Sequence, residues 1–486
     1  RSAGLRPGTN HNDEHKMANE WGQANASYSI APIRLPTPFE RRMTQTKLQA
    51  ANPPHLAAAE AFAASAVGPE WLRTLRRNGV THFTELGFPT TKLEDWIYCN
   101  VAPITKLAFK PAAGADAGVT AKQLAPFAFP GWTGSRLVFV NGHFAPALST
   151  LPAPQKGVTI TNLAAALTSG AALVQAHLAH HASVDASGFS ALNTAFIADG
   201  AFIVLAPNAV AAEPVHLLFV SAPNDAANAA QPRNLIVADA NSSAKVVEHY
   251  VSLGGAAHFT NAVTEIAVGE GANIEHAKFQ EENLEAFHIA TVQATLARDS
   301  RFLSHSISTG ARLARHNINL VMIDQGVDCV MNGLYAVGGK QLVDHHTVAD
   351  HAQPHCGSHE FYHGILGGSS RGVFNGKIFV RKDAQKTDAK QTSRNLLLTD
   401  TAIVDTKPQL EILADDVKCT HGATVGQLND EALFYCRTRG IAEVNARRLL
   451  THAFASEIVN RITVEPVREH LEQVLWARLE ELIEKK

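Results

Sequence analysis

A cysteine and a histidine stand two positions apart late in the chain, as Cys419 and His421. Residues two apart on an extended strand point the same way, so the thiol and the imidazole would share one face. A thiol beside an imidazole suits a soft metal ligand or a nucleophile. A buried cysteine beside a hydrogen-bonded histidine explains the same spacing equally well.

Residues 345–363 hold a second group of metal-ligand types, six of the 24 histidines and one cysteine. The group consists of His345, His346, His351, His355, Cys356, His359 and His363. Imidazole and thiolate bind zinc, iron or copper, and a continuous strand would align residues 351, 355, 359 and 363 on one face. A metal-binding enzyme using this segment is therefore an alternative function. The spacing matches no closed metal site, however, and polar side chains at strand ends and turns also explain it.

Two short sequence patterns resemble nucleotide-binding and hydrolase motifs, but each lacks something that its motif requires. The Gly-Lys pairs at 339–340 and 376–377 lack the first glycine and the following Ser/Thr of a phosphate-binding loop, so ATP hydrolysis by that route is not expected. Residues 368–372 match G-x-S-x-G, but strand-like residues follow where a nucleophile elbow needs a helix. A Gly/Ser turn is the favoured interpretation of Ser370.

Composition excludes several classes of protein. The 486 residues carry a net charge of -3, which gives no general electrostatic reason to bind nucleic acid or an anionic membrane. Five cysteines without a C-x-x-C pair exclude a disulfide scaffold and a zinc ribbon, and they fit a reducing compartment. No run of 18 apolar residues is present, so we expect no transmembrane helix.

The chain divides into four predicted regions. Residues 1–42 are expected to be a disordered extension, either translated upstream sequence or a tag. They resemble neither a secretory signal nor an acid-poor transit peptide, which favours the bacterial cytoplasm over a plastid. Residues 43–200 are predicted to be an N-terminal helical and mixed domain, residues 201–425 a β-rich core, and residues 426–486 a C-terminal helical domain. A stripe of apolar residues at helical spacing supports the last assignment.

The β-rich core has a weak internal repeat. Turn signals begin at residues 241, 269, 297 and 324, so they recur every 27 or 28 residues, with alternating strand-like segments between them. A unit of this size cannot bury its apolar face alone and must stack on its neighbours. A parallel β-helix, or solenoid, fits this pattern best, and a large β-sandwich is the alternative.

Several segments resemble the SufB/SufD family of iron–sulfur cluster assembly proteins. They are DTKPQLEILADDVKCTHGATVG (405–426), GVFNGK (372–377), QKTDA (385–389), NLLL (395–398), FYCRTRGI (434–441) and, nearer the N-terminus, PTTKLEDWIY (89–98). The first five lie together in the second half of the chain. The SufB branch carries an N-terminal cysteine cluster, whereas Cys99 is the only cysteine here before residue 300, so the resemblance is to the SufD branch.

The resemblance implies a mainly β fold, a right-handed parallel β-helix flanked by helical N- and C-terminal domains. It implies a scaffold rather than an enzyme, paired with a SufB-like subunit and a SufC-like ATPase that supplies the ATPase activity. A nascent iron–sulfur cluster would form at the SufB–SufD interface, with His421 as an iron contact and Cys419 as an auxiliary thiol. His351 and Cys356 fit the family frame as further metal candidates, whereas the other histidines of 345–363 stay outside the site.

The resemblance carries three further expectations. A flavin is associated with such complexes, although no feature of this sequence locates it. A chain on its own can pair with a second copy through the β-helix edge that otherwise meets SufB. No nucleic-acid or membrane partner is expected.

Overall fold

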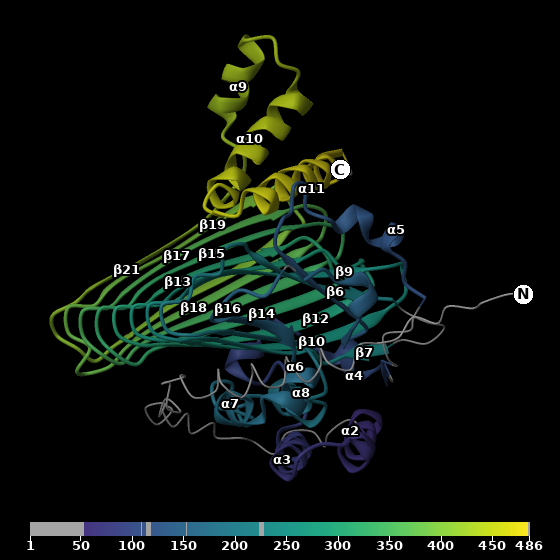
Figure 1. Cartoon of the computed structure of the whole chain (residues 1–486). Coiled ribbons are helices and arrows are strands. Elements are labelled where there is room, and N and C mark those ends of the chain that lie inside the picture. The colour runs from purple at the N-terminus through teal and green to yellow at the C-terminus, as the bar shows by residue number, and fades with distance from the viewer. Residues whose placement is uncertain (1–52, 108, 113–117, 152, 223–227, 485–486) are drawn as a thin grey trace, which may run out of the picture.

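The computed structural model describes residues 53–484 apart from residues 108, 113–117, 152 and 223–227. The expectation for residues 1–42 lies outside the described residues. Within them, the structure is a β-solenoid with helices at both ends of the chain (Figure 1). The predicted solenoid is thus confirmed, and the sandwich alternative is wrong.

Two long parallel sheets form the walls of the solenoid, which makes about 8 turns over residues 202–426. Successive turns add one strand to each sheet, since Phe259 pairs with Phe287, which in turn pairs with Leu313. One sheet contains β5 (Ala201–Leu205), β8 (Arg233–Ala238), β10 (His258–Val268), β12 (Phe287–Leu296), β14 (Leu313–Met322), β16 (Leu342–His351), β18 (Arg371–Val380) and β20 (Ile403–Ile412). The other contains β6 (Val215–Ser221), β9 (Ser243–Ser252), β11 (Asn273–Gln280), β13 (Arg301–Ser308), β15 (Asp328–Val337), β17 (Gly357–Leu366), β19 (Asp388–Leu397) and β21 (Lys418–Gly426).

The turn signals of the sequence have a common backbone cause. Each of the first four turns contains a residue at positive φ, namely Asn241, Gly271, Asp299 and Gly326. Glycine, asparagine and aspartate tolerate this left-handed conformation best, which explains why these residue types recur at the repeat spacing.

Short strands close the N-terminal end of both sheets. The two-residue β3 (His143–Phe144) runs antiparallel to β2 (Ser135–Val140), and β4 (Val158–Asn162) runs antiparallel to β5. Two further short strands, β1 (Lys110–Pro111) and β7 (Asn228–Ala230), pair beside β10.

Helices cover the outer face of the solenoid near this end. The N-terminal helices and 3-10 turns are α2 (Pro53–Ser65), α3 (Glu70–Leu86), η1 (Glu94–Trp96), α4 (Ala102–Thr105), α5 (Ala121–Leu124), η2 (Ala125–Phe127), η3 (Pro146–Leu148), α6 (Leu163–Ser169), α7 (Ala171–His177) and α8 (Gly188–Ala195). An aromatic core joins α3 and α8 to the solenoid, with Phe83, Phe189 and Phe259 all buried in it. Gly79 allows the close packing, because a Cβ there would lie 2.4 Å from the Ala195 amide nitrogen.

The predicted C-terminal helices are α9 (Asp430–Thr438), α10 (Glu443–Val459) and α11 (Glu465–Glu484). In Figure 1, α11 lies along the solenoid while α9 and the start of α10 project away from it. The apolar stripe of α11, including Leu471, Leu475 and Leu479, is buried against Val247 and Phe279 of the solenoid wall. This stripe therefore packs on the chain itself and does not form a free apolar face.

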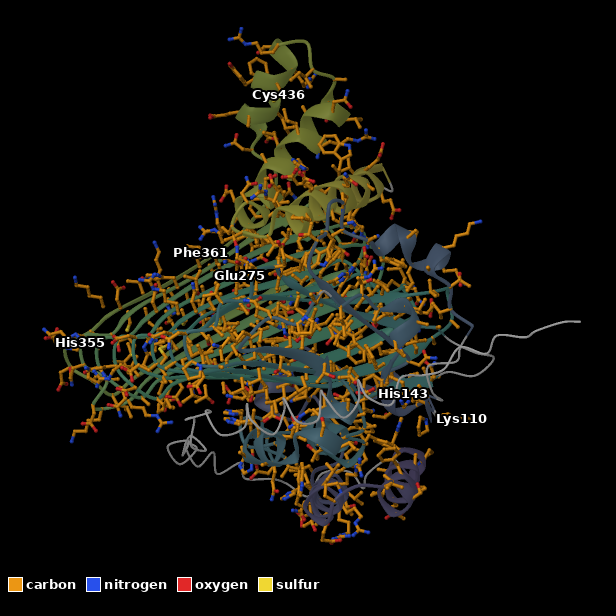
Figure 2. The ribbon with its side chains drawn as sticks, in the orientation of Figure 1. Lys110, His143, Glu275, His355, Phe361 and Cys436 are labelled. Carbon is orange, nitrogen blue, oxygen red and sulfur yellow. The ribbon has the colours of Figure 1, made fainter. Side chains whose placement is uncertain are left out.

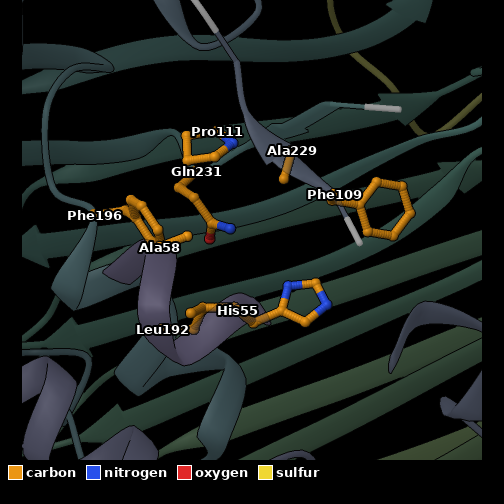
Figure 3. A pocket seen from close by; sticks show the side chains of 8 residues that line it. All are labelled: His55, Ala58, Phe109, Pro111, Leu192, Phe196, Ala229 and Gln231. Atoms are coloured by element: carbon orange, nitrogen blue, oxygen red, sulfur yellow. The ribbon is translucent and has the colours of Figure 1, made fainter. Parts of the chain in front are cut away.

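A small cavity lies between α2, α8 and the short strands β1 and β7 (Figure 3). It measures about 20 Å³ and is lined mainly by apolar groups, among them Phe109 and Phe196, together with the polar side chains of His55 and Gln231. A cavity of this size holds about one water molecule, so it is a packing defect rather than a ligand site.

Candidate functional site

The sequence-predicted pair Cys419 and His421 lies on β21, the last strand of its sheet. Among the described residues β21 is hydrogen-bonded to β19 alone, and β20 is likewise the terminal strand of the other sheet. The C-terminal end of the solenoid is therefore open within the described chain, with a nine-residue and a ten-residue strand edge unpaired.

Cys419 and His421 continue a file of side chains that faces the solenoid interior. Their register partners on β19 are Ala389 and Gln391, which are both 1 % exposed. Gln391 points across the interior, because a Cβ on Gly376 of β18 would lie 2.1 Å from its amide nitrogen. Since β21 ends the described stack, Cys419 is only half-buried and His421 is exposed.

The facing strand β20 adds apolar groups to this open end. Leu410 packs with Ile378 and Ala389 in a small core that Cys419 also touches. Ile412 of β20 and Val425 of β21 are 37 % and 48 % exposed. Interior residues that the next turn would normally bury are left uncovered here, so this end has the character of an interface.

The thiol of Cys419 is not activated in the isolated chain. Burial raises its pKa and the nearby Asp388 adds to the effect, while a backbone hydrogen bond from Ala389 opposes it. The thiol form is therefore favoured at neutral pH.

Cys419 and His421 do not make a metal site by themselves. In the described part of the chain, they belong to no group of three His, Cys, Asp or Glu side chains close enough to share an ion. Two ligand-type residues leave the remaining coordination positions of a metal to other groups.

The histidines of 345–363 do not form one aligned site, so that expectation is wrong. His351 ends β16 and His355 lies in the following turn at φ 59, whereas His359 and His363 lie on β17. Figure 2 shows His355 at the tip of a turn on the solenoid surface. The turn interrupts the strand, so the alternation of side chains between two faces does not continue from β16 into β17.

The two weaker metal candidates of this segment have protein partners instead. Nε2 of His351 lies 2.8 Å from the Ser358 hydroxyl, and burial lowers the pKa of this histidine to about 4. The Cys356 thiol donates to the Asp324 and Pro354 carbonyls at 3.3 and 3.5 Å. These contacts support a structural role for both residues, whose metal binding stays a prediction.

The other histidines also have local roles. His345 lies near the Ser306 and Ser308 hydroxyls at 3.4 and 3.2 Å, and His346 lies 3.0 Å from Asp344. Nδ1 of His363 lies 3.0 Å from the Phe454 carbonyl of α10, so this residue anchors a C-terminal helix.

The G-x-S-x-G match is a turn, as the sequence favoured. Ser370 is fully buried, and its hydroxyl donates to the Gly367 carbonyl at 2.8 Å before β18 begins. Gly368, at φ 60, supplies the left-handed residue of this turn.

Sequence reasoning missed a buried carboxyl beneath the open end. Glu360 of β17 accepts hydrogen bonds on Oε2 from the Thr347 hydroxyl at 2.6 Å and from the Gln391 amide at 3.2 Å. Its other oxygen has no protein partner, and burial raises its pKa to about 7. The sequence alone does not tell whether a glutamate on a strand faces inward or outward, because the register of the strand is not known.

Comparisons with known proteins place the chain in a family. Residues 219–454 match the domain described as SUF system FeS cluster assembly, SufBD core domain, and residues 59–217 match the SufBD protein N-terminal region. The chain therefore belongs to the SufBD family of iron–sulfur cluster assembly proteins.

Its relatives include proteins named SufD. The chain is 32% identical to the iron–sulfur cluster assembly protein SufD of Escherichia coli over 428 residues, which cover 87% of this chain and 95% of that protein. It is 33% identical to a SufBD family protein of Synechocystis, over 81% of this chain and 88% of the relative. SufD of Bacillus subtilis is 27% identical over 84% of this chain and 94% of its own length. No helix that the structure describes is long and apolar enough to cross a membrane.

Proposed function

We propose that the open end of the solenoid, formed by β20 and β21, pairs with the solenoid of a SufB-like subunit, and that a nascent iron–sulfur cluster assembles at the joint. The observation that carries the proposal is the position of Cys419 and His421, which face inward on the terminal strand of the described sheet. A partner strand added to this edge would satisfy its free backbone groups and cover the exposed Val425.

The chemistry of the two side chains suits a shared cluster. An exposed imidazole at His421 can bind iron through a nitrogen, and the Cys419 thiol can bind iron or hold sulfur once it loses its proton. The partner would supply the remaining ligands, so the cluster is built as cargo between two subunits. The chain acts here as a scaffold and not as an enzyme.

The projecting C-terminal helices are the proposed contact for a SufC-like ATPase. Phe434 and Tyr435 of α9 are 68 % and 59 % exposed, and Val444 and Leu449 of α10 are 49 % and 47 % exposed. Figure 2 shows Cys436 within this projecting pair, far from the solenoid wall. Exposed aromatic and aliphatic groups on a small helical pair are typical of a docking surface.

The same helices link the ATPase to the cluster site. The C-terminal half of α10 is anchored to β17 through the contact between His363 and Phe454. ATP binding that closes two ATPase subunits would pull on α9 and α10 and shear the joint at β20 and β21. Cys419 and His421 would then become accessible to iron and sulfur.

Three finer expectations belong with this function. The bacterial cytoplasm is the proposed location, in keeping with the bacterial relatives. A flavin in the assembled complex stays a prediction without a location in this chain. A second copy of the chain occupies the open end when the SufB-like subunit is absent, which a measurement of solution mass would detect. No observation favours the alternative of a metalloenzyme built on residues 345–363.

The direct test is cluster formation by the complex reconstituted from this chain and its SufB-like and SufC-like partners. Cys419→Ala and His421→Ala are each expected to lower cluster yield at least tenfold while the subunits still co-purify, because they remove ligands and not the strand edge. Thr420→Ala is the matched control, since it lies between them on β21 and faces outward beside Lys390. Normal yield with both variants, or failure of the wild-type chain to co-purify with either partner, would overturn the proposal.

A further inference from the structure

A cluster of metal-ligand side chains lies far from the open end, between helix α11 and the solenoid wall. Its members are His249 on β9, Glu281 directly after β11 and His470 on α11, and one ligand atom of each lies within 4.8 Å of the other two. Nε2 of His249 lies 2.7 Å from Oε1 of Glu281, and Nε2 of His470 lies 3.9 Å from the same oxygen. Three segments distant in sequence therefore meet at one carboxylate.

The cluster is buried and incompletely satisfied. His249 is fully buried and His470 is 6 % exposed. Nε2 of His470 has no hydrogen-bond partner, because 3.9 Å is too long for one, and Nδ1 of His249 has none either. A buried polar atom without a partner is costly, so a native structure that keeps one needs a reason.

The chemistry of the three side chains suits a transition metal. Both histidines turn Nε2 toward the same oxygen of Glu281. Imidazole nitrogen and carboxylate oxygen are ligands that zinc takes in proteins.

We propose that His249, Glu281 and His470 bind one divalent transition-metal ion, with zinc as the first candidate, and that this ion clamps α11 to the solenoid. Two histidines and one glutamate are a recurrent protein ligand set for zinc, with water in the fourth position. Bonds of about 2.0–2.1 Å place tetrahedral ligands roughly 3.4 Å apart. On binding, Nε2 of His249 and Oε1 of Glu281, now 2.7 Å apart, would therefore separate slightly, and Nε2 of His470, now 3.9 Å from that oxygen, would move closer to it.

The surroundings fit such a clamp. Phe129 and Phe279 flank the His249 ring at 5.3 and 4.9 Å between ring centroids, and Phe129 also packs edge-on against His470 at 5.2 Å. An apolar shell of this kind limits water access and holds ligand rings in orientation. His216 stacks on His249 at 5.6 Å and also has an unpartnered Nε2. This site is independent of Cys419 and His421 and does not rest on the proposed function.

The competing explanation is that the same residues form only a packed imidazole and aromatic cluster. The two explanations differ in their response to added metal, because a packing cluster gains nothing from zinc whereas a ligand set is stabilised by it. The experiment uses the full chain stripped with a chelator and carrying Cys419→Ser, so that the half-buried thiol does not contribute to binding. Zinc binding is followed by calorimetry and by the thermal midpoint, and cobalt(II) serves as a spectroscopic probe.

One equivalent of zinc is expected to bind and to raise the thermal midpoint. His470→Gln and Glu281→Gln are each expected to weaken this binding at least tenfold and to abolish the rise. His363→Asn is the control, because that histidine also joins a C-terminal helix to the solenoid yet lies outside the cluster, and its zinc affinity should be unchanged. If His470→Gln does not fold, the comparison of Glu281→Gln with the parent chain decides the question. The absence of saturable binding, or equal affinity in Glu281→Gln and the parent chain, would overturn the proposal.

Discussion

The two ends of the solenoid are built in opposite ways. At the N-terminal end the terminal strands β3 and β4 have two and five residues, and both run antiparallel to their neighbours. At the C-terminal end the terminal strands β20 and β21 are ten and nine residues long and continue the parallel register. Short antiparallel strands blunt an edge, whereas long parallel strands offer a template for further pairing.

The two ends also differ in how completely a buried carboxyl group is hydrogen-bonded. Near the closed end, Glu248 accepts hydrogen bonds from Tyr250 and Thr264 and lies 3.0 Å from Nε2 of His276. Near the open end, one oxygen of Glu360 has no protein partner. The closed end thus has short strand edges and a fully hydrogen-bonded Glu248, while the open end has the long strand edges and exposed interior of an unfinished stack.

The largest expected effect is a loss of folding stability at the closed end, where a fully buried ion pair joins the helices to the solenoid. Arg233 donates to Glu265 at 2.9 and 2.7 Å, and the same carboxylate accepts the Ala179, His181 and Ala182 amides. Removing the cation leaves a buried carboxylate unpaired, so Arg233→Met should lower the free energy of unfolding by about 3–5 kcal/mol. Urea denaturation measures this change.

The matched control is an ion pair nearer the open end. Arg381 binds Asp350 through two nitrogens, but their side chains are 22% and 14% exposed. Because solvent screens such a pair, Arg381→Met should cost about 1 kcal/mol or less. Equal losses of unfolding free energy in the two variants would contradict the distinction between the closed and the open end.

The next largest expected effect is a loss of affinity for the proposed partner at the open edge. Leu410→Asp places a charge among interior-facing groups that a partner solenoid would bury, and an unpaired buried charge costs at least about 3 kcal/mol. Affinity for the SufB-like subunit should therefore fall more than about 100-fold, as measured by calorimetry or a pull-down titration.

The corresponding substitution at the closed edge is Thr159→Asp on β4, and it should leave that affinity unchanged. Retained affinity in Leu410→Asp, or an equal loss in Thr159→Asp, would show that the partner does not use the open end.

A smaller effect is the pH dependence set by Glu360. Its pKa is raised from 4.5 to about 7, mainly by burial. Between these two values the unfolded chain loses a proton that the folded chain keeps, so this group lowers stability as pH rises through the window. Glu360→Gln should be about 3 kcal/mol more stable than the parent at pH 8 and similar to it at pH 4.

Ionisation of Glu248 has the opposite effect on folding stability, so this residue serves as the internal comparison. Burial alone would raise its pKa, but hydrogen bonding and attraction to His276 lower it to about 2. Its ionised form therefore adds stability that is present above pH 4.5 and lost as the pH falls toward 2. Glu248→Gln should thus destabilise the chain at pH 7, and a gain there would contradict the contrast between the two carboxyls.

The solenoid could be predicted because its turns depend on a local backbone requirement. Asn241, Gly271, Asp299 and Gly326 mark the early turns with residue types that favour positive φ. Later turns use His355 and Lys386 at φ 59 and 63, which hide the repeat. His355 also stands within a run of histidines, so the sequence suggests a ligand set where the structure has a turn.

The candidate site could be predicted only in part. The spacing of Cys419 and His421 correctly indicates one shared face, because alternation is a local property of a strand. The position of β21 at the end of its sheet depends on how the whole chain stacks, and no local pattern encodes this. The cluster of His249, Glu281 and His470 depends on where α11 crosses the wall, which is set by the whole packed core.

The smallest expected effect, and the finest probe of the open end, is the reactivity of Cys419. It is half-buried, whereas the other four cysteines are buried. Iodoacetamide should therefore modify Cys419 alone in the folded chain, a few-fold more slowly than a free cysteine, because burial raises the pKa of its thiol and the thiolate is the reacting form. Binding of the SufB-like subunit should slow this modification further, and mass spectrometry of the labelled peptide measures both rates. Cys419→Ser should leave the folded chain unlabelled, and labelling of buried Cys356 at a comparable rate would show that the solenoid opens elsewhere than at its C-terminal end.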